Sequence, residues 1–173
     1  MEIRRLESAD REMLARFLER VPEGDRTFFK EDVDDPRVVE AWVRPGPART
    51  IAVEDGRVVG WLSLVRLHGW SDHVGEVRLI VDPAARGRGI GRALVRRAVV
   101  EALDLGLEKM VVEVIAGQEP TIAMFRSLGF DPEALLTDHV RDQAGNLRDL
   151  MILSHSVQEQ WSAMIRAGIA DEV

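Results

Sequence analysis

The sequence predicts a single domain of mixed α/β class, with a central sheet flanked by helices. Patterns typical of strands and of amphipathic helices alternate along the 173 residues. A glycine-rich turn joins an apolar, β-branched run to one of these helices, and neither a linker nor an internal repeat divides the chain. We therefore expect one domain over residues 1–156, large enough to bury a core, followed by a helical extension over residues 157–173.

The first quarter of the chain predicts one strand and two helices. Met1 to Leu6 alternates as a short strand, and Ser8 is the expected N-cap of the helix after it. Residues 21–35 are polar, acidic and typical of a loop. Pro36 then opens a short helix that extends to Trp42.

The next segments predict the centre of the sheet and its longest helix. Residues 50–53 and 58–67 form strands around Asp55-Gly56, a dipeptide typical of tight hairpins. A further strand covers residues 76–81. The helix after it ends near Gly106, and its buried stripe consists of Ile90, Ala93, Leu94, Ala98 and Leu103.

The last third of the chain predicts a strand, a helix and a second hairpin. Residues 110–115 form the strand, residues 120–128 the helix, and residues 135–141 and 147–153 the hairpin. A modest amphipathic helix covers residues 157–169. It must bury its apolar side against its own domain or against a second copy of the chain, so a monomer and a homodimer are both compatible with the sequence.

Composition excludes several kinds of protein. The chain has no cysteine, which removes disulfides, thiol nucleophiles and cysteine metal sites, and its four histidines lack the spacing of metal ligands. No apolar run is long enough to span a membrane, and the N-terminus lacks the apolar core of a signal peptide. We expect a cytoplasmic protein that binds no metal and no membrane.

Positive charge is concentrated in one short segment. The chain carries a net charge of −7, yet residues 78–97 contain six arginines and one acid, which leaves −12 for the remainder. A basic island on an acidic protein suits one compact polyanion. It does not suit nucleic acid, which needs an extended basic face. For Arg96 and Arg97, an ordinary solvated helix face is the competing interpretation.

The basic island contains a glycine-rich turn. Residues 81–92 read V-D-P-A-A-R-G-R-G-I-G-R, after a strand and before a helix. Gly87, Gly89 and Gly91 let the backbone approach a ligand with successive N–H groups, and the helix adds the positive end of its dipole. These features predict a pyrophosphate site. The glycine spacing differs from the dinucleotide fingerprint, and the lysine of an ATP-binding loop is missing.

The motif from Arg86 to Gly91, R-x-x-G-x-G, resembles the acetyl-CoA signature of the GNAT superfamily of N-acetyltransferases. A second stretch, Gln118 to Phe130, resembles the family's other signature, and the order of elements matches over Met1 to Leu153. The resemblance implies a mostly antiparallel mixed sheet with a V-shaped split, and acetyl-CoA as cosubstrate. It implies cosubstrate binding by Leu79, Ile80, Val81, Arg86, Gly87, Arg88, Gly89, Ile90, Gly91, Arg92, Gln118 and Phe125.

The same resemblance implies how an amine is acetylated. A general base removes a proton from the ammonium, and a backbone N–H of Leu79 or Ile80, in a strand opened by a bulge, stabilises the oxyanion. Glu76, near the start of that strand, is the candidate base. The alternatives are Glu113 as the base, and Glu76 as a strand-end carboxylate that is merely solvated or paired with Arg78. Because the chain has no cysteine to carry an acyl group, we expect direct transfer in a ternary complex, with a serine as the remaining candidate carrier.

One departure from the family leaves a second function open. Many members use a tyrosine as general acid, and this chain has none, because Phe125 stands at the matching position. A thiolate with a pKa of about 8.5 leaves without a strong acid. The departure nevertheless also suits a non-catalytic acyl-CoA-binding or sensing domain. Acidic loop residues suggest a cationic acceptor, either a small amine or a protein lysine; they are Glu23, Asp25, Glu31, Asp32, Asp34, Asp35 and Asp72.

Overall fold

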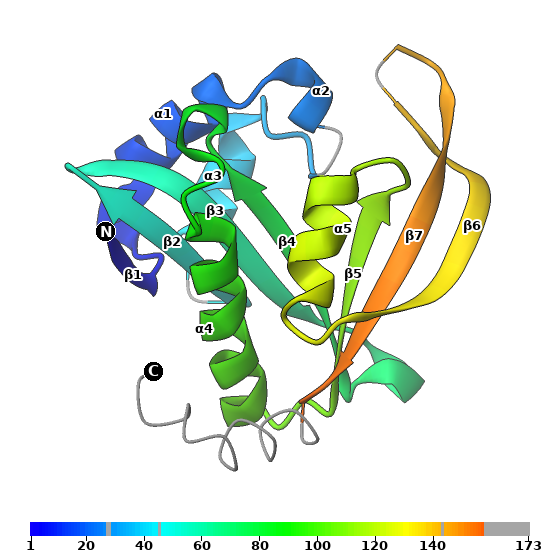
Figure 1. Ribbon diagram of the computed structural model, residues 1–173. Helices are drawn as coiled ribbons and strands as arrows, with labels where there is room; N and C mark the ends of the chain where they lie inside the picture. The colour runs from blue at the N-terminus through cyan, green and yellow to red at the C-terminus, as the bar shows by residue number, and fades with distance from the viewer. Residues whose placement is uncertain (27–28, 45, 143, 158–173) are drawn as a thin grey trace.

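The sheet of this protein is mixed, with one parallel pair of strands at its centre. The computed structural model describes residues 1–26, 29–44, 46–142 and 144–157. Within these ranges seven strands form one sheet in the order β1-β2-β3-β4-β5-β7-β6. Neighbouring strands are antiparallel except for β4 and β5. Helices cover both faces (Figure 1), so the predicted fold class is confirmed.

Every strand and helix predicted within the described residues is present, with small changes at the ends. The strands are β1 (Glu2–Arg5), β2 (Ala48–Glu54), β3 (Arg57–Arg66), β4 (Val74–Val81), β5 (Lys109–Ile115), β6 (Asp131–Arg141) and β7 (Leu147–Ser156). The α-helices are α1 (Arg11–Arg20), α2 (Glu23–Arg26), α3 (Pro36–Trp42), α4 (Ile90–Asp104) and α5 (Glu119–Arg126). No helix in the described ranges combines the length and the apolar character that a membrane crossing requires.

Two hydrophobic clusters lie on opposite faces of the sheet. On one face, α1 and α3 pack through Phe17 and Trp42 against strand residues that include Ile80 of β4. On the other face, α4 and α5 cover a larger cluster in which Leu94 packs with Val77 of β4. Successive side chains of a strand point to opposite faces, so β4 contributes to both clusters. This central strand therefore depends on packing from both layers.

Strands β4 and β5 part halfway along their length. Their parallel ladder covers only Val74–Val77 of β4 and Lys109–Val112 of β5. Beyond the ladder, β4 stays paired with β3 as far as Val81, and β5 stays paired with β7 as far as Ile115. The sheet thus opens into a fork between β4 and β5, which is the predicted V-shaped split. Crevices of this kind, beyond the carboxyl ends of parallel strands, are common ligand sites.

The start of the first helix differs from the prediction. Ser8 begins a short 3₁₀ turn, and Asp10 rather than Ser8 stands at the N-cap of α1. The physical reason lies in the 3₁₀ turn, because the Asp10 side chain holds that turn and makes no cap bond to α1. Its carboxylate accepts the Glu7 N–H at 2.9 Å and two bonds of 2.6 Å from the guanidinium of Arg4. Part of the predicted acidic loop also forms the short helix α2.

Val157 is the last residue of the described ranges. Its N–H donates to Glu108 O at 3.0 Å, and its side chain is buried in the same cluster as α4. The rest of the predicted helix over residues 157–169 lies outside the described residues. The sequence left open whether this helix packs on its own domain or forms a homodimer contact. The residues that would decide between the two also lie outside the described ranges.

Helix α4 lies close to β3 because Gly60 has no side chain. A Cβ built on Gly60 would lie 2.9 Å from Leu94 Cδ1 and 3.0 Å from Ile90 Cγ2. Ile90 is the first residue of α4 and follows the glycine-rich turn directly. The contact at Gly60 therefore sets where the N-terminus of α4, and the turn before it, lie against the sheet.

We expect Gly60→Ala to lower the free energy of unfolding by about 1–3 kcal/mol, because the added methyl group overpacks the contact between α4 and β3. Denaturant titration followed by circular dichroism measures this change. Gly24→Ala is the matched control, since a Cβ on Gly24 in α2 has no heavy atom within 4 Å. That variant should be neutral or slightly more stable. Wild-type stability in Gly60→Ala would contradict the packing argument.

Candidate active site

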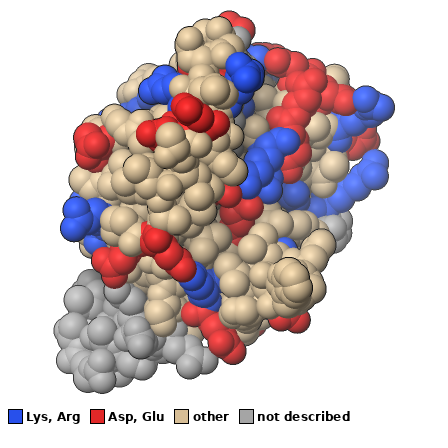
Figure 2. Space-filling model, turned by 90° about the vertical axis from the view of Figure 1, so that its right-hand side faces the viewer, with Lys and Arg blue, Asp and Glu red and all other residues tan. Residues whose placement is uncertain are grey.

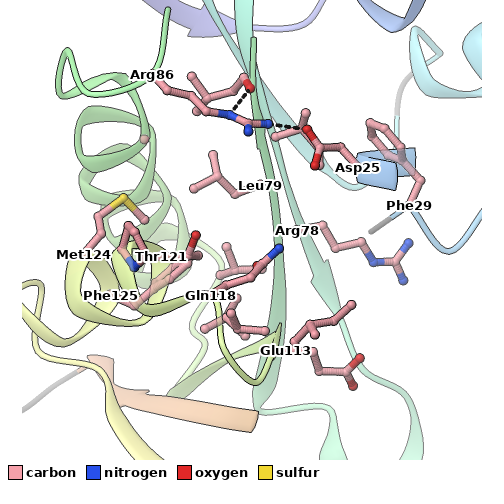
Figure 3. A pocket seen from close by; sticks show the side chains of 18 of the residues that line it. Asp25, Phe29, Arg78, Leu79, Arg86, Glu113, Gln118, Thr121, Met124 and Phe125 are labelled. Carbon is pink, nitrogen blue, oxygen red and sulfur yellow. Dashed lines mark hydrogen bonds and ion pairs between the residues drawn. The ribbon is translucent and has the colours of Figure 1, made fainter. Parts of the chain in front are cut away.

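A cleft of about 950 Å³ follows the fork between β4 and β5. Side chains from β4, from the glycine-rich turn and from α5 surround it (Figure 3). The rival carboxylate Glu113 of β5 also lines it. The predicted site residues that line the cleft are Glu76, Leu79, Ile80, Val81, Arg86, Gly87, Gly89, Ile90, Gly91, Arg92, Gln118 and Phe125.

Two glycines give the turn its backbone shape. Gly87 has a φ of 75° and Gly89 a φ of 82°, in the left-handed region where a side chain causes strain. Gly89 is the N-cap of α4. Upstream, the Asp82 carboxylate accepts the Ala84 N–H at 3.0 Å and the Arg20 Nε–H at 2.9 Å, which holds the start of the turn. The first N–H groups of α4 lack partners within the helix, so this end of the cleft suits an anion.

Gly91 acts through packing rather than backbone conformation. It is buried in the first turn of α4. A Cβ there would lie 3.0 Å from Met124 Sδ and 3.5 Å from Leu79 Cδ2. Gly91 therefore lets α4 approach both α5 and β4 at the wall of the cleft.

The backbone of β4 directs alternate amides into the fork. At one end of the β3–β4 ladder, Asp82 N donates to Val59 O at 3.0 Å. Because paired and unpaired positions alternate along an antiparallel ladder, the even-numbered residues of β4 direct their N–H and C=O groups to β3. The odd-numbered residues direct theirs toward β5. Beyond the β4–β5 ladder, the N–H of Leu79 therefore points into the fork, whereas that of Ile80 points to β3.

The bulge that we expected in β4 is not present. Strands β3 and β4 pair one to one, from Gly60 with Val81 to Arg66 with Gly75. The opening comes instead from the divergence of β4 and β5, each of which keeps its other neighbour. Alternation along the strand is enough to direct the Leu79 amide into the opening.

Two cations hold Glu76 on the face of the sheet that α1 and α3 cover. Its carboxylate accepts the Arg78 Nε–H at 2.7 Å and lies 3.0 Å from Lys30 Nζ. Glu76 is only 8% exposed. Burial raises the pKa of Glu76, but the hydrogen bonds from Arg78 and Lys30 outweigh it and hold the pKa below its usual value. Glu76 is therefore ionised at neutral pH.

A row of alternating charges crosses this side of the cleft. Lys30 Nζ also lies 3.1 Å from Glu113 Oε2. Arg78 Nη1 lies 3.0 Å from each carboxylate oxygen of Glu31. The row therefore runs Glu113–Lys30–Glu76–Arg78–Glu31, and each cation lies between two carboxylates. Such compensation keeps partly buried charges tolerable, because each has an opposite charge in contact.

Arg86 and Arg88 leave the glycine-rich turn in different directions. Arg86 pairs with Asp25 of α2, and its Nε–H donates to Val81 O at 3.2 Å, so it reaches across the cleft (Figure 3). Arg88 lies 2.9 Å from Glu54 of β2 and is not among the described residues that line the cleft. Arg88 is thus a predicted cosubstrate-binding residue whose side chain the structure directs away from the cleft.

The second signature forms the wall opposite β4. Gln118 is the N-cap of α5, and its side chain extends into the cleft toward β4 (Figure 3). Phe125 is 1% exposed and packs edge-on against Phe130, with ring centroids 5.1 Å apart. Phe125 is therefore part of the core as well as of the cleft wall, and its ring carries no proton to donate.

A bulge in β6 brings a histidine to the cleft. The β6–β7 register shifts between Leu136 and Val140, and Asp138 adopts a φ of 52° within the shift. Asp138 N donates to Asp149 Oδ1 at 2.9 Å, which supports this unusual conformation. His139 then lines the cleft. Within the described ranges, no group of three or more His, Cys, Asp or Glu side chains is arranged to hold a metal ion.

Sequence reasoning missed Lys30 and overlooked the role of Asp25. Both belong to the segment that we expected to be a polar loop. Phe29 anchors this segment, because it is buried with its ring centroid 5.6 Å from that of Trp42 and 5.5 Å from that of Trp61. An aromatic residue in an otherwise polar loop was the available signal, but nothing local indicated which charged groups it would bring to the cleft.

Charges around the cleft are largely compensated within the protein. The face seen in Figure 2 carries acidic and basic side chains in small neighbouring groups. Several acids of the loop that suggested a cationic acceptor are paired with arginines; the pairs are Asp25–Arg86, Glu31–Arg78, Asp34–Arg26 and Asp35–Arg37. The number of acidic residues in this loop therefore overstates the negative charge that is available to a cationic acceptor.

One family accounts for the fold and for both signatures. A family model described as the acetyltransferase (GNAT) family matches residues 9–130, which include the glycine-rich turn and helix α5. The match covers more than half of the chain. This protein belongs to the GNAT family of acetyltransferases.

The relatives cover different shares of this chain. The uncharacterized N-acetyltransferase YjgM of Escherichia coli is 27% identical over 157 residues, which are 86% of this chain and 94% of YjgM. The mycothiol acetyltransferase of Pseudarthrobacter chlorophenolicus is 33% identical over 97 residues, which are 54% of this chain. That match spans only 30% of the mycothiol enzyme.

Solved structures share the same fold. The structure of yncA from Salmonella typhimurium, which holds its cofactor acetyl-CoA, superposes with a TM-score of 0.74 at 24% sequence identity. The superposition covers 91% of this chain and 94% of yncA. At this level of identity, the likeness supports the fold and leaves the acceptor of this protein open.

We expect Gly89→Ala to weaken acetyl-CoA binding about tenfold, equal to roughly one lost hydrogen bond, because the backbone can no longer approach the ligand closely. Isothermal calorimetry measures the affinity. Gly56→Ala is the matched control, since Gly56 also has a positive φ with nothing within 4 Å of an added Cβ, but lies in the β2–β3 turn. Both variants should lose about 1–2 kcal/mol of stability. Equal affinities in the two variants would argue against the turn as the phosphate site.

We also expect Glu76→Gln to be less stable than the wild type by about 1–3 kcal/mol at pH 7, because the charge-assisted bonds to Arg78 and Lys30 are lost. The folded-state pKa of Glu76 is depressed. Its contribution is therefore present above the unfolded-state value, about 4.3. The contribution should be lost as the pH falls through the folded-state pKa. Denaturant titrations at several pH values test this, and a pH-independent difference would contradict it.

Proposed function

We propose that this protein transfers the acetyl group of acetyl-CoA to a primary amine, by direct attack within a ternary complex. The observation that carries the proposal is the position of the fork. It lies between a helix N-terminus that suits an anion on one side and a buried, ionised carboxylate on the other. Membership of the GNAT family supports the same activity.

The cleft has a suitable partner for each part of acetyl-CoA. The N–H groups at Gly89 and the first turn of α4 would hold the pyrophosphate, with Arg92 beside them. The odd-numbered amides of β4 would pair with the pantetheine arm as an added strand would. Arg86 now bonds to Val81 O. It must turn away before that carbonyl can pair with the arm, and its guanidinium then becomes available to a phosphate.

The reacting groups follow from the same geometry. An acceptor ammonium entering from the α1–α3 side meets the Glu76 carboxylate and gives up a proton to it, directly or through water. The neutral amine then attacks the thioester carbonyl. The Leu79 N–H points into the fork and donates to the carbonyl oxygen as negative charge develops there. The depressed pKa of Glu76 keeps its carboxylate ionised at neutral pH and therefore able to accept a proton.

The leaving group needs little help. The thiolate of CoA has a pKa of about 8.5, so it departs without a strong acid. The buried ring of Phe125 cannot serve as one. Water, or a proton from the attacking amine, can complete the thiol. The absence of tyrosine from the sequence is therefore compatible with turnover.

We expect Glu76→Gln to lower kcat about 100-fold while acetyl-CoA affinity stays at the wild-type level. The assay follows thiol release from acetyl-CoA over a panel of small amines, amino acids and lysine peptides. Glu133→Gln is the matched control, because Glu133 also pairs with a lysine, at 2.7 Å, but does not line the cleft among the described residues. It should keep wild-type turnover.

The outcomes of this assay separate the alternatives. Glu113 would be identified as the base if Glu76→Gln kept wild-type turnover and Glu113→Gln lost most of it. Acetyl-CoA binding without turnover of any amine by the wild type would instead favour the non-catalytic acyl-CoA-binding domain. Trapping of a covalent acetyl-enzyme on the transfer pathway would overturn direct transfer.

A further inference from the structure

A lysine of the protein's own chain occupies the acceptor side of the cleft. Lys30 is one of only two lysines in the sequence. Its Nζ lies 3.0 Å from the carboxylate of Glu76 and 3.1 Å from that of Glu113. Lys30 lines the cleft, and its side chain is 45% exposed. It is thus a primary amine held at the fork by the two carboxylates that are candidates for the base.

The fork fixes where an acceptor nitrogen has to lie. Glu76 pairs with Val111 within the β4–β5 ladder, and Glu113 is the first residue of β5 beyond it. Residues two apart on a strand share a face, so Glu113 lies on the same face as Val111 and Glu76. Lys30 Nζ bridges these carboxylates, beside the point where the strands part. A proton acceptor acts at about 2.6–3.2 Å from the nitrogen that it deprotonates, and the nitrogen of Lys30 already lies within that distance of Glu76.

The placement of Lys30 depends on the packing next to it. Phe29 is buried in the cluster of α1 and α3, with its ring against those of Trp42 and Trp61. Its N–H donates to Arg26 O at 3.1 Å. The anchored Phe29 keeps the base of the Lys30 side chain at the edge of the cleft.

We propose that Lys30 is an acetylation site, and that the protein modifies it within its own molecule when acetyl-CoA is bound. The inference rests on the proposed function. The Lys30 ammonium loses one proton to Glu76 and from there to solvent. Its nitrogen forms a bond to the thioester carbonyl carbon, the carbon–sulfur bond breaks, and the sulfur leaves with a second proton as the thiol. The products are an amide on Lys30 and free CoA.

The modification changes the charge of the acceptor site. The unmodified Lys30 competes with an external amine for Glu76 and Glu113, because its ammonium already contacts both carboxylates. The amide nitrogen of acetyl-lysine carries no charge. Acetylation therefore leaves Glu113 without the Lys30 ammonium, and Glu76 with Arg78 as its cation. The site then attracts an external ammonium more strongly.

The other lysine provides an internal reference. Lys109 lies at the start of β5, where its Nζ pairs with Glu133 at 2.7 Å. It is 35% exposed, comparable to Lys30, and does not line the cleft among the described residues. Chemical acetylation by acetyl-CoA would reach both lysines, whereas catalysed transfer within the cleft would reach Lys30 alone.

The test incubates the full chain with acetyl-CoA and no other amine, and maps acetyl-lysine by peptide mass spectrometry over time. We expect one acetyl group on Lys30, none on Lys109, and a first-order rate constant that does not change when the protein is diluted. Lys30→Arg keeps the positive charge and should remain unmodified. Lys109→Arg should be modified at the wild-type rate. Glu76→Gln should slow the reaction as much as it slows turnover of external amines.

Several results would overturn the proposal. Equal acetylation of Lys30 and Lys109, or of heat-unfolded protein, would identify chemical modification. A rate constant that rises with protein concentration would identify transfer between molecules. An unmodified Lys30 in a protein that acetylates external amines would overturn this inference and leave the proposed function intact. Failure to bind acetyl-CoA in calorimetry would overturn both.

Discussion

The structure depends on the parting of two parallel strands at the centre of the sheet. Each strand keeps a partner on its outer side, so the sheet stays intact while its middle opens. The cost is a set of backbone groups on β4 that point into the opening without a neighbouring strand. Backbone groups of this kind need a partner, either water or a ligand that can pair as a strand does. A peptide-like chain with amides of its own is the ligand that this edge suits best.

The same opening explains how the charges are arranged. On the side of α4, the positive end of a helix dipole and an adjacent arginine favour an anion. On the side of α1 and α3, a carboxylate lies in the sheet with cations on both flanks, so it stays ionised despite burial. The fork thus joins a site for negative charge to a site for positive charge. The proposed reaction, between an anionic thioester carrier and an ammonium, would use this separation of charge.

Local rules were sufficient to predict most of the fold. Pro36 at the first position of α3, and Asp55-Gly56 between β2 and β3, mark boundaries that the structure reproduces. Two of the departures from the prediction have separate physical reasons. Ser8 is an adequate N-cap, but Asp10 gains a bidentate bond from Arg4 on a neighbouring strand. The bulge expected in β4 was unnecessary, because divergence from β5 already exposes the Leu79 amide.

The candidate site likewise has some features that the sequence predicts and others that only the tertiary structure reveals. The glycine-rich turn, the alternation of β4 and the helix after Gln118 were determined by the sequence itself, since each depends on residues that are neighbours in the chain. The tertiary structure decided which charged groups meet. Lys30 reaches Glu76, and Arg86 reaches Asp25, because a buried phenylalanine and two packed layers carry distant segments to one cleft. No periodic pattern in the sequence indicates which charged side chains will pair. Only the packed fold therefore reveals which charges lie together.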